Sequence, residues 1–373
     1  IPGPACAAMS HLLRGAMNLL GGADAGSSAG GGGRNLIGTT IDTQHVKIRI
    51  RSQIAQGGFA TVYSGTDSSG IWYAVKVQLA NEPSAAEQIR DEIRMVSELS
   101  HRHILQYVDS ARHSLPNGTK EFILVTELCS GGSVIDMLTN GTPLTSPQVA
   151  NIFHAATSAL AYLHSRNPPI THRDMKVENL LLDSAGRVKL CDFGSATTEQ
   201  YAPDETWNAA RRTKLEEDFQ RHTTPMYRAP EILETYQHFP VGPLQDVWAV
   251  GCVLFYLCYR VHPFEDSAKL RIVYAKYQIP SGPEAERYAD FQPLIESTLQ
   301  PDPRTRPSAA ELQERIAALS VAMNVRVDVA VPGVDTTMLT GGEQQTTRPT
   351  VVTPSRPPGH PLGQHSQQQQ QQQ

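Results

Sequence analysis

The first half of the chain shows the alternation of apolar and polar residues that predicts β-strands. A helical pattern interrupts it at about residues 84–99, where Ile89, Ile93 and Val96 fall on one face. After Gly132 the apolar spacing becomes mostly helical. The predicted strands are residues 46–54, 61–67, 72–79 and 122–128. The pattern predicts a small β-rich lobe, a larger helical lobe, and a cleft between them that suits a ligand.

Both ends of the chain lack a pattern that could form a core. Residues 21–34 read GGADAGSSAGGGGR, and the composition after residue 320 shifts to Thr, Pro, Gly and Gln. Such segments bury too little apolar surface to offset their chain entropy. The expected units are a flexible Gly/Ser-rich segment (1–45), a globular domain (46–319) with an N-lobe (46–128) and a C-lobe (129–319), and a disordered tail (320–373).

Composition and charge exclude several classes of protein. The net charge of -5 argues against a nucleic-acid binder that neutralises phosphates. The longest apolar run, residues 247–258, is too short to span a bilayer and predicts a buried helix. Five cysteines without a Cys-x-x-Cys pair indicate reduced thiols in the cytosol. The chain opens with Ile, so we expect the residues before Met9 to be upstream translated sequence or an artefact.

The densest group of polar residues surrounds a short predicted hairpin. The segment HRDMKVEN (172–179) leads into two apolar stretches joined by a Ser-Ala-Gly turn (180–191), and Asp-Phe-Gly follows. Because the turn makes the strands antiparallel, Asn179 before the first and Asp192 after the second lie at the same end. Asp174, Asn179 and Asp192 can then face one space. Their oxygens suit Mg²⁺, which usually also binds substrate phosphates.

This block resembles the catalytic loop and Asp-Phe-Gly segment of eukaryotic protein kinases. The resemblance implies an α+β, bilobal eukaryotic protein kinase fold, with a β-rich N-lobe and a helical C-lobe. It also implies that Asp174 orients the attacking hydroxyl and accepts its proton, while Lys176 steadies the γ-phosphate of ATP. Asn179 and Asp192 would hold the metals, so the expected cofactors are ATP and Mg²⁺. A structural hairpin with incidental polar residues is the alternative, and the full spacing argues against it.

A loop between the first two predicted strands resembles the kinase glycine-rich loop, whose backbone N–H groups cover the ATP phosphates. Two of the three motif glycines are Ala55 and Ala60 here, and only Gly57 stands. Alanine tolerates positive φ poorly, so the loop alone is weak evidence against an ordinary hairpin turn. The nucleotide-binding residues expected here are Ile54, Ala55, Gln56, Gly57, Gly58, Phe59, Ala60, Thr61 and Val62.

Lys76 lies within an apolar predicted strand, where a lysine needs a partner or solvent. Glu92 on the following helix is the best partner, although Glu87 and Glu98 lie on the same helix. The resemblance implies that Lys76 pairs with Glu92 and touches the α and β phosphates. A snorkelling lysine beside a solvated glutamate is the alternative. The other expected nucleotide contacts are Ala74, the gatekeeper Thr126, and the hinge residues Glu127 and Cys129.

Two spacings resemble serine/threonine kinases and not tyrosine kinases. Lys176 follows Asp174 by two residues, and Thr224 precedes Glu231 by seven. We expect Thr224 to form hydrogen bonds with Asp174 and Lys176 across the acceptor site.

Residues further along resemble structural positions of the kinase fold. Glu231 of the Ala-Pro-Glu segment is expected to pair with Arg306. Asp246 is expected to cap the apolar helix and to form hydrogen bonds with the backbone of the catalytic loop. Charged residues at 211–218 indicate a solvated helix or a peptide-docking surface. We expect this segment to be ordered without phosphorylation of Thr223.

The segments HRDMKVENLLL, LCDFGSATT, IAQGGFATVY, RHTTPMYRAPEIL and HPFEDSAKLRIV together resemble the numb-associated kinase family, in which the two alanines of the loop are themselves usual. The resemblance implies phosphorylation of the mu chains of clathrin adaptors in clathrin-mediated vesicle trafficking. It implies partners in the clathrin machinery and a cytoplasmic protein that associates peripherally with clathrin-coated vesicles and perinuclear membranes. It also implies an extra helix after the Ala-Pro-Glu segment, which residues 234–242 could partly form.

Two other functions compete with an active kinase. A pseudokinase or scaffold that recruits endocytic partners is opposed by the intact Lys76, Asp174 and Asp192. A P-loop ATPase would need a GxxxxGK[ST] motif, which the chain lacks. Phosphatase-like and J domains, which the family can carry, are not visible, so we expect a fragment or a shorter paralogue.

Overall fold

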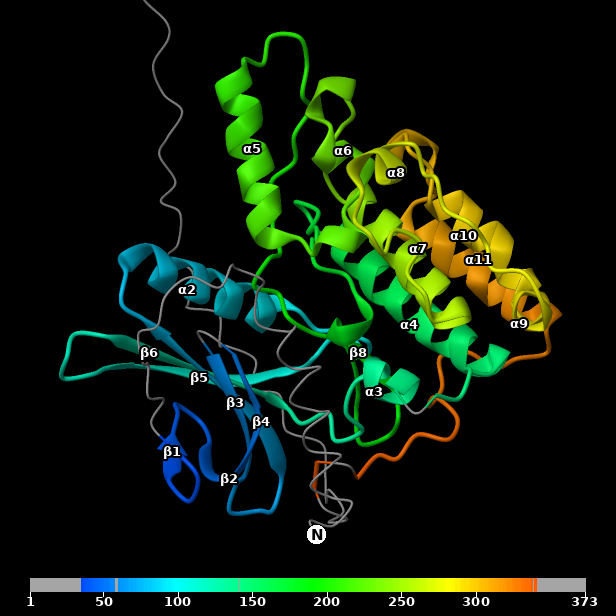
Figure 1. The fold of residues 1–373 in the computed structure, drawn as a ribbon. Coiled ribbons are helices and arrows are strands. Elements are labelled where there is room, and N and C mark those ends of the chain that lie inside the picture. Colours follow the sequence, from blue (N-terminus) through cyan, green and yellow to red (C-terminus); the bar gives the residue numbers. More distant parts are fainter. Residues whose placement is uncertain (1–34, 58–59, 140, 338, 341–373) are drawn as a thin grey trace, which may run out of the picture.

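The computed structural model describes residues 35–57, 60–139, 141–337 and 339–340, and these form two lobes (Figure 1). The N-lobe is an antiparallel six-stranded sheet in the order β1-β2-β3-β4-β6-β5. Helix α2 (Pro83–Glu98) packs beside it. The strands are β1 (Thr40–Asp42), β2 (Lys47–Gln56), β3 (Ala60–Thr66), β4 (Trp72–Ala80), β5 (Tyr107–Ser114) and β6 (Lys120–Glu127). The predicted α+β fold is confirmed, and β1 and β5 are additions to the predicted strands.

The alternating pattern of the strands buries one face of the sheet. Ile48, Ile50, Val75 and Val125 are each at most 1% exposed and form one apolar cluster. This burial, rather than the propensity of any single strand, holds the register of the sheet. The face toward the C-lobe carries the residues of the cleft.

The C-lobe is built around two buried helices. Helix α7 (Leu244–Tyr259) contains the apolar run of residues 247–258, and it is buried on nearly all sides, as predicted. Helix α4 (Ser146–His164) packs against it and begins with a capping box of Thr145 and Gln148. The other C-lobe elements are α3 (Val134–Thr139), β7 (Leu180–Leu182), β8 (Val188–Leu190), α5 (Ala209–His222), α6 (Pro230–Leu233), α8 (Lys269–Val273), α9 (Pro283–Arg287), α10 (Gln292–Thr298) and α11 (Ala309–Ala322).

Parts of both expected flexible ends belong to the folded domain. Leu36 and Ile41 are buried in the core of the sheet, although they lie within residues 1–45. Helix α11 ends at Ala322, past the expected domain boundary at 319, and residues 323–337 and 339–340 continue along the C-lobe. At both ends, a few apolar side chains within a polar stretch pack against the domain. Val331, for example, is only 3% exposed. The remaining expected flexible residues lie outside the described parts.

The helix expected at residues 234–242 is not present there, so that expectation was wrong. Those residues contain a single 3₁₀ turn, Thr235–Gln237, which ends at His238 with φ 58°. The helix nearest to this region before the Ala-Pro-Glu segment is α5, which Asn208 caps. Its Leu215 and Phe219 are buried in a small separate core. A helix forms at 209–222 because charged residues there leave a narrow apolar face.

The helices and the cysteines of the described residues agree with two expectations from the sequence. Within those residues, each helix is too short or too polar to cross a membrane. Cys129, Cys191, Cys252 and Cys258 are free and buried. Cys6 lies outside the described residues.

Candidate active site

The β7–β8 hairpin brings the predicted metal ligands to one end, as its antiparallel register requires. The side-chain amide of Asn179 donates to the main-chain carbonyl of Asp174 at 2.7 Å and to its carboxylate at 3.2 Å. The backbone N–H of Cys191, next to Asp192, donates to the carbonyl of Asn179 at 3.0 Å. The catalytic loop and the Asp-Phe-Gly segment are therefore joined across the hairpin.

The donor set at this end fits a hard divalent cation. Oδ1 of Asn179 is buried and has no hydrogen-bond partner among the described residues, which is costly unless a ligand satisfies it. Burial raises the pKa of the Asp192 carboxyl, and Lys76 opposes that rise. A bound cation would stabilise the ionised carboxylate further. Asn179 and Asp192 can therefore hold Mg²⁺, as the sequence suggested.

Asp174 lies in a compact group of polar side chains. Lys176 Nζ is 2.8 Å from one carboxylate oxygen, and the Thr224 hydroxyl donates to the other at 2.6 Å. Lys176 Nζ also donates to the Thr224 hydroxyl at 3.1 Å. Burial alone would raise the pKa of Asp174, but these two partners outweigh it and lower the pKa. The carboxylate is therefore ionised at neutral pH and can accept a proton or a hydrogen bond.

Asp246 fixes the backbone of the catalytic loop, as expected. Its carboxylate accepts hydrogen bonds from the N–H groups of His172 at 2.7 Å and Arg173 at 2.9 Å. Arg173 has φ 67°, a strained value for a residue with a side chain, and these bonds hold it there. The expectation that Asp246 caps the helix was wrong, because it lies within the first turn of α7 and no side-chain cap is present.

Lys76 on β4 lies between two carboxylates. Its Nζ is 2.7 Å from Glu92 on α2 and 3.7 Å from Asp192. Glu92 is buried, whereas Glu87 and Glu98 are exposed. Burial would lower the pKa of Lys76, but the two carboxylates outweigh it and raise the pKa. A charged amine thus faces the cleft from the N-lobe.

A largely apolar pocket opens between the lobes beside Lys76. The expected nucleotide-binding residues that line it are Ile54, Ala55, Val62, Ala74, Lys76, Thr126, Glu127, Cys129 and Asp192. Gln56, Gly57, Ala60 and Thr61 lie on the β2–β3 turn outside this lining. Gly58 and Phe59 lie outside the described residues. Apolar walls with a few charged groups at one end are typical of a site for a nucleotide.

The pocket also contains residues that sequence reasoning missed. They are Val96, Leu105, Leu124, Gly132, Ser133, Asp136, Leu181, Cys191, Phe193 and Leu339, whereas Leu128 falls within the expected hinge from Glu127 to Cys129. Leu181 and Cys191 adjoin the predicted motifs, so strand alternation could have indicated them. Leu339 lies in the tail that composition marks as disordered, and no local signal identifies it.

The side chain of Glu127 is not directed at a nucleotide. Its carboxylate lies 2.6 Å from Lys189 on β8 and accepts a hydrogen bond from the N–H of Gln106 at 3.0 Å. The side chain therefore joins the hinge to the C-lobe. The N–H of Glu127 donates to the carbonyl of Gln106 at 3.0 Å, which leaves the carbonyl of Glu127 as the group that could face an adenine.

An acidic residue on α5 holds the catalytic-loop arginine. Arg173 Nη1 lies 2.8 Å from Asp218, and Arg173 also donates to the carbonyl of Ser195. The hydrogen bond from His222 lowers the pKa of Asp218 to about 2 against the effect of burial, with Arg173 contributing. Asp218 is thus ionised at neutral pH. A carboxylate occupies the place beside Arg173 that a phosphate could otherwise take.

Comparison with known proteins identifies the family of this fold and site. The family model described as "Protein kinase domain" matches residues 48–315. A probable serine/threonine-protein kinase of Dictyostelium discoideum is 37% identical over 289 residues, covering 76% of this chain and 25% of that protein. Actin-regulating kinase 1 of Saccharomyces cerevisiae is 30% identical over 295 residues, covering 76% of this chain and 45% of its own length.

A second probable serine/threonine-protein kinase of Dictyostelium discoideum is 33% identical over 288 residues, covering 75% of this chain and 35% of that protein. The chain thus spans less than half the length of the curated relatives that it matches. The family model covers most of this chain and includes the hairpin, the lysine–glutamate pair and the pocket. The chain therefore belongs to the protein kinase domain family.

Proposed function

We propose that this protein kinase is an active enzyme that transfers the γ-phosphoryl group of ATP to serine or threonine hydroxyls of proteins. The observation that carries the proposal is the arrangement of Asp174, Lys176 and Thr224 opposite Lys76. The names of two relatives, which describe them as serine/threonine-protein kinases, agree with the choice of acceptor. A pseudokinase or scaffold would not need an ionised, desolvated base.

The chain's own residues support a simple transfer mechanism. The Asp174 carboxylate orients the acceptor hydroxyl and takes its proton as the oxygen attacks the γ-phosphorus; the bond from that phosphorus to the β,γ-bridging oxygen breaks and ADP leaves. Lys176, next to it, neutralises charge on the γ-phosphate, while Lys76 binds the α and β phosphates. Mg²⁺, held by Asn179 and Asp192, would neutralise phosphate charge when bound. The Lys76–Glu92 contact keeps the amine directed into the cleft.

We further propose that the chain is a member of the numb-associated kinase family that resembles cyclin-G-associated kinase, and that its substrates are mu chains of clathrin adaptors. The loop with Ala55 and Ala60 and the residues around Thr224 support this assignment. It implies recruitment to clathrin-coated vesicles through partners in the clathrin machinery. The name of Actin-regulating kinase 1 instead favours a role near actin, which makes actin-associated proteins the competing substrates.

Phosphorylation of matched peptides tests the substrate proposal. The chain is incubated with radiolabelled ATP and Mg²⁺, and with a mu-chain peptide that contains one threonine. The control is the same peptide with that threonine replaced by alanine. We expect label on the first peptide alone. Label on a generic serine/threonine substrate without label on the mu-chain peptide would contradict the clathrin assignment while preserving the kinase proposal.

The ion pair between Arg173 and Asp218 bears on whether the kinase needs phosphorylation to be active. Because Asp218 already neutralises Arg173, we expect phosphatase treatment to leave the activity unchanged. Asp218→Asn is expected to lower kcat about threefold to tenfold, since a partly exposed ion pair contributes roughly 1 kcal/mol. Glu217→Gln, on an exposed face of the same helix, is the matched control. Loss of activity on phosphatase treatment, or equal rates for the two variants, would contradict this role of Asp218.

A further inference from the structure

The segment that follows α11 lies along the C-lobe and reaches the nucleotide pocket. We call residues 325–340 the C-terminal strap. In Figure 1 its orange trace leaves α11, passes α3 and runs toward the N-lobe. The described residues of the strap contact the domain at three places along this path. The strap contacts the connection between α2 and β5, then α4 and the β7–β8 turn, and finally the residue after the hinge.

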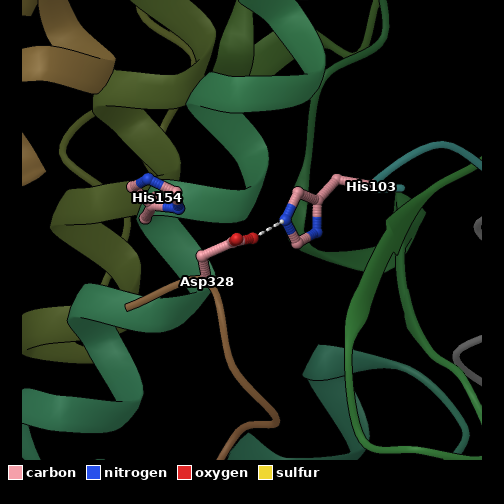
Figure 2. A group of neighbouring side chains, drawn as sticks. All are labelled: His103, His154 and Asp328. Carbon is pink, nitrogen blue, oxygen red and sulfur yellow. Dashed lines mark hydrogen bonds and ion pairs between the residues drawn. The ribbon is translucent and has the colours of Figure 1, made fainter. Parts of the chain in front are cut away.

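The first contact joins the strap to the connection between α2 and β5. One carboxylate oxygen of Asp328 pairs with Arg102, and the other lies 2.9 Å from Nε2 of His103 (Figure 2). Nδ1 of His103 lies 2.9 Å from the carbonyl of Val188 on β8. The buried His103 ring is therefore held between the catalytic hairpin and the strap.

His103, His154 and Asp328 also have ligand atoms within 4.8 Å of one another, a grouping that could hold a metal ion. Arg102 pairs with the same carboxylate, so a cation would have to compete with a guanidinium. Burial lowers the pKa of His154, so its ring adds no charge at neutral pH. We interpret the group as an anchor of the strap, because the ion pair with Arg102 is already in place.

The second contact runs along α4 and the turn of the β7–β8 hairpin. Asn151 donates to the carbonyl of Arg326 at 2.8 Å, and Gln148 donates to that of Pro332 at 2.8 Å. Val331 is 3% exposed, and its N–H donates to the carbonyl of Gly186 at 2.8 Å. Side-chain donors thus meet backbone acceptors in a stretch without helix or strand, which compensates for its missing secondary structure.

The third contact lies at the mouth of the pocket. The hydroxyl of Ser130, just beyond the hinge, donates to the carbonyl of Thr336, and the N–H of Leu339 donates to the carbonyl of Ser130 at 3.2 Å. The Leu339 side chain lines the pocket. All other lining residues fall between Ile54 and Phe193, so Leu339 comes from a distant part of the sequence.

We propose that the strap forms one wall of the nucleotide site, and that Leu339 sets nucleotide affinity by contacting the adenine side. This inference rests on the proposed kinase function. The hydrogen bond to Ser130, the residue after Cys129 of the hinge, places an apolar side chain where an adenine ring would need cover from water. The three contacts order the strap beforehand, which reduces the entropy lost on binding.

The test measures MgATP binding and steady-state kinetics of the full chain. Leu339→Ala is expected to raise both the Kd and the KM for MgATP about threefold to tenfold, the loss expected for a half-buried leucine. We expect kcat to change by less than about twofold, because Leu339 is remote from the transferred group. Leu270→Ala, at a site 69% exposed on α8, is the matched control and should bind as the wild type does.

A second variant acts on the anchor instead of the pocket. Asp328→Asn preserves the shape of the side chain and suits φ 63°, but it removes the charge that pairs with Arg102. We expect the Kd for MgATP to rise, but by less than it does in Leu339→Ala. If the wild type binds MgATP and both variants bind it equally well or more tightly, the role of the strap is overturned. If the wild type itself binds no MgATP, the proposed kinase function fails instead.

Discussion

Asp174→Ala is expected to lower kcat for phosphoryl transfer by about 10²–10⁴-fold, the usual contribution of a positioned base. Asp174 is the ionised group beside the acceptor site, and its removal also frees Lys176 and Thr224 from their shared partner. The nucleotide pocket does not include Asp174, so the Kd for MgATP should change little. The effect should therefore appear in kcat rather than in KM.

The measurement is incorporation of radiolabel into a threonine peptide, with nucleotide binding measured on the same preparations. Asp290→Ala removes an exposed aspartate remote from the catalytic loop and is the matched control. We expect that variant to match the wild type. Equal incorporation by Asp174→Ala and the wild type would exclude the enzyme and leave the nucleotide-binding scaffold as the function.

Arg306→Ala is expected to lower the free energy of unfolding by about 3–5 kcal/mol, because it leaves a buried carboxylate without its partner. Arg306 binds Glu231 through two hydrogen bonds of 2.7 and 2.8 Å, as predicted from the sequence, and both side chains are 0% exposed. Arg306 also donates to the carbonyls of Leu244 at 2.9 Å and Gln300 at 2.8 Å. The arginine thus ties the Ala-Pro-Glu segment to α7 and to the loop before α11.

Urea unfolding monitored by tryptophan fluorescence measures this effect. Arg304→Ala breaks an ion pair with Asp302 in which the arginine side chain is 64% exposed, and it should leave the free energy of unfolding nearly unchanged. The double variant Glu231→Leu, Arg306→Met should recover part of the loss, since no charge then remains buried. Unfolding of Arg306→Ala at the same urea concentration as Arg304→Ala would show that the pair does not hold the lobe together.

The fold class and much of the site could be predicted because their signals are local. The β7–β8 turn is short, so the spacing from Asp174 to Asp192 alone brings Asn179 and Asp192 to one end of a hairpin. Lys76 on an apolar strand required a partner, and Glu92 was the best candidate on the next helix. Alternation identified β2, β3, β4 and β6. It missed β5, whose sequence YVDSARHS carries polar residues on both faces of an edge strand.

The remaining features depend on contacts between distant residues. The sequence suggested a charged helix near residues 211–218, but only packing placed Asp218 of α5 against Arg173. Composition marked residues 320–373 as disordered, since a mean over many polar residues hides a few apolar ones. Val331 and Leu339 are such residues.

By itself, the sequence determined the two-lobed kinase fold and which candidate catalytic residues lie near one another, because short spacings on strands and turns fix which side chains share a face. Only the tertiary structure decided which residues complete the nucleotide pocket and what holds the catalytic-loop arginine. One of those contacts, between Ser130 and Leu339, joins residues more than a hundred positions apart in the sequence. Their stability comes from surfaces that exist only after the domain has folded, so no local pattern records them.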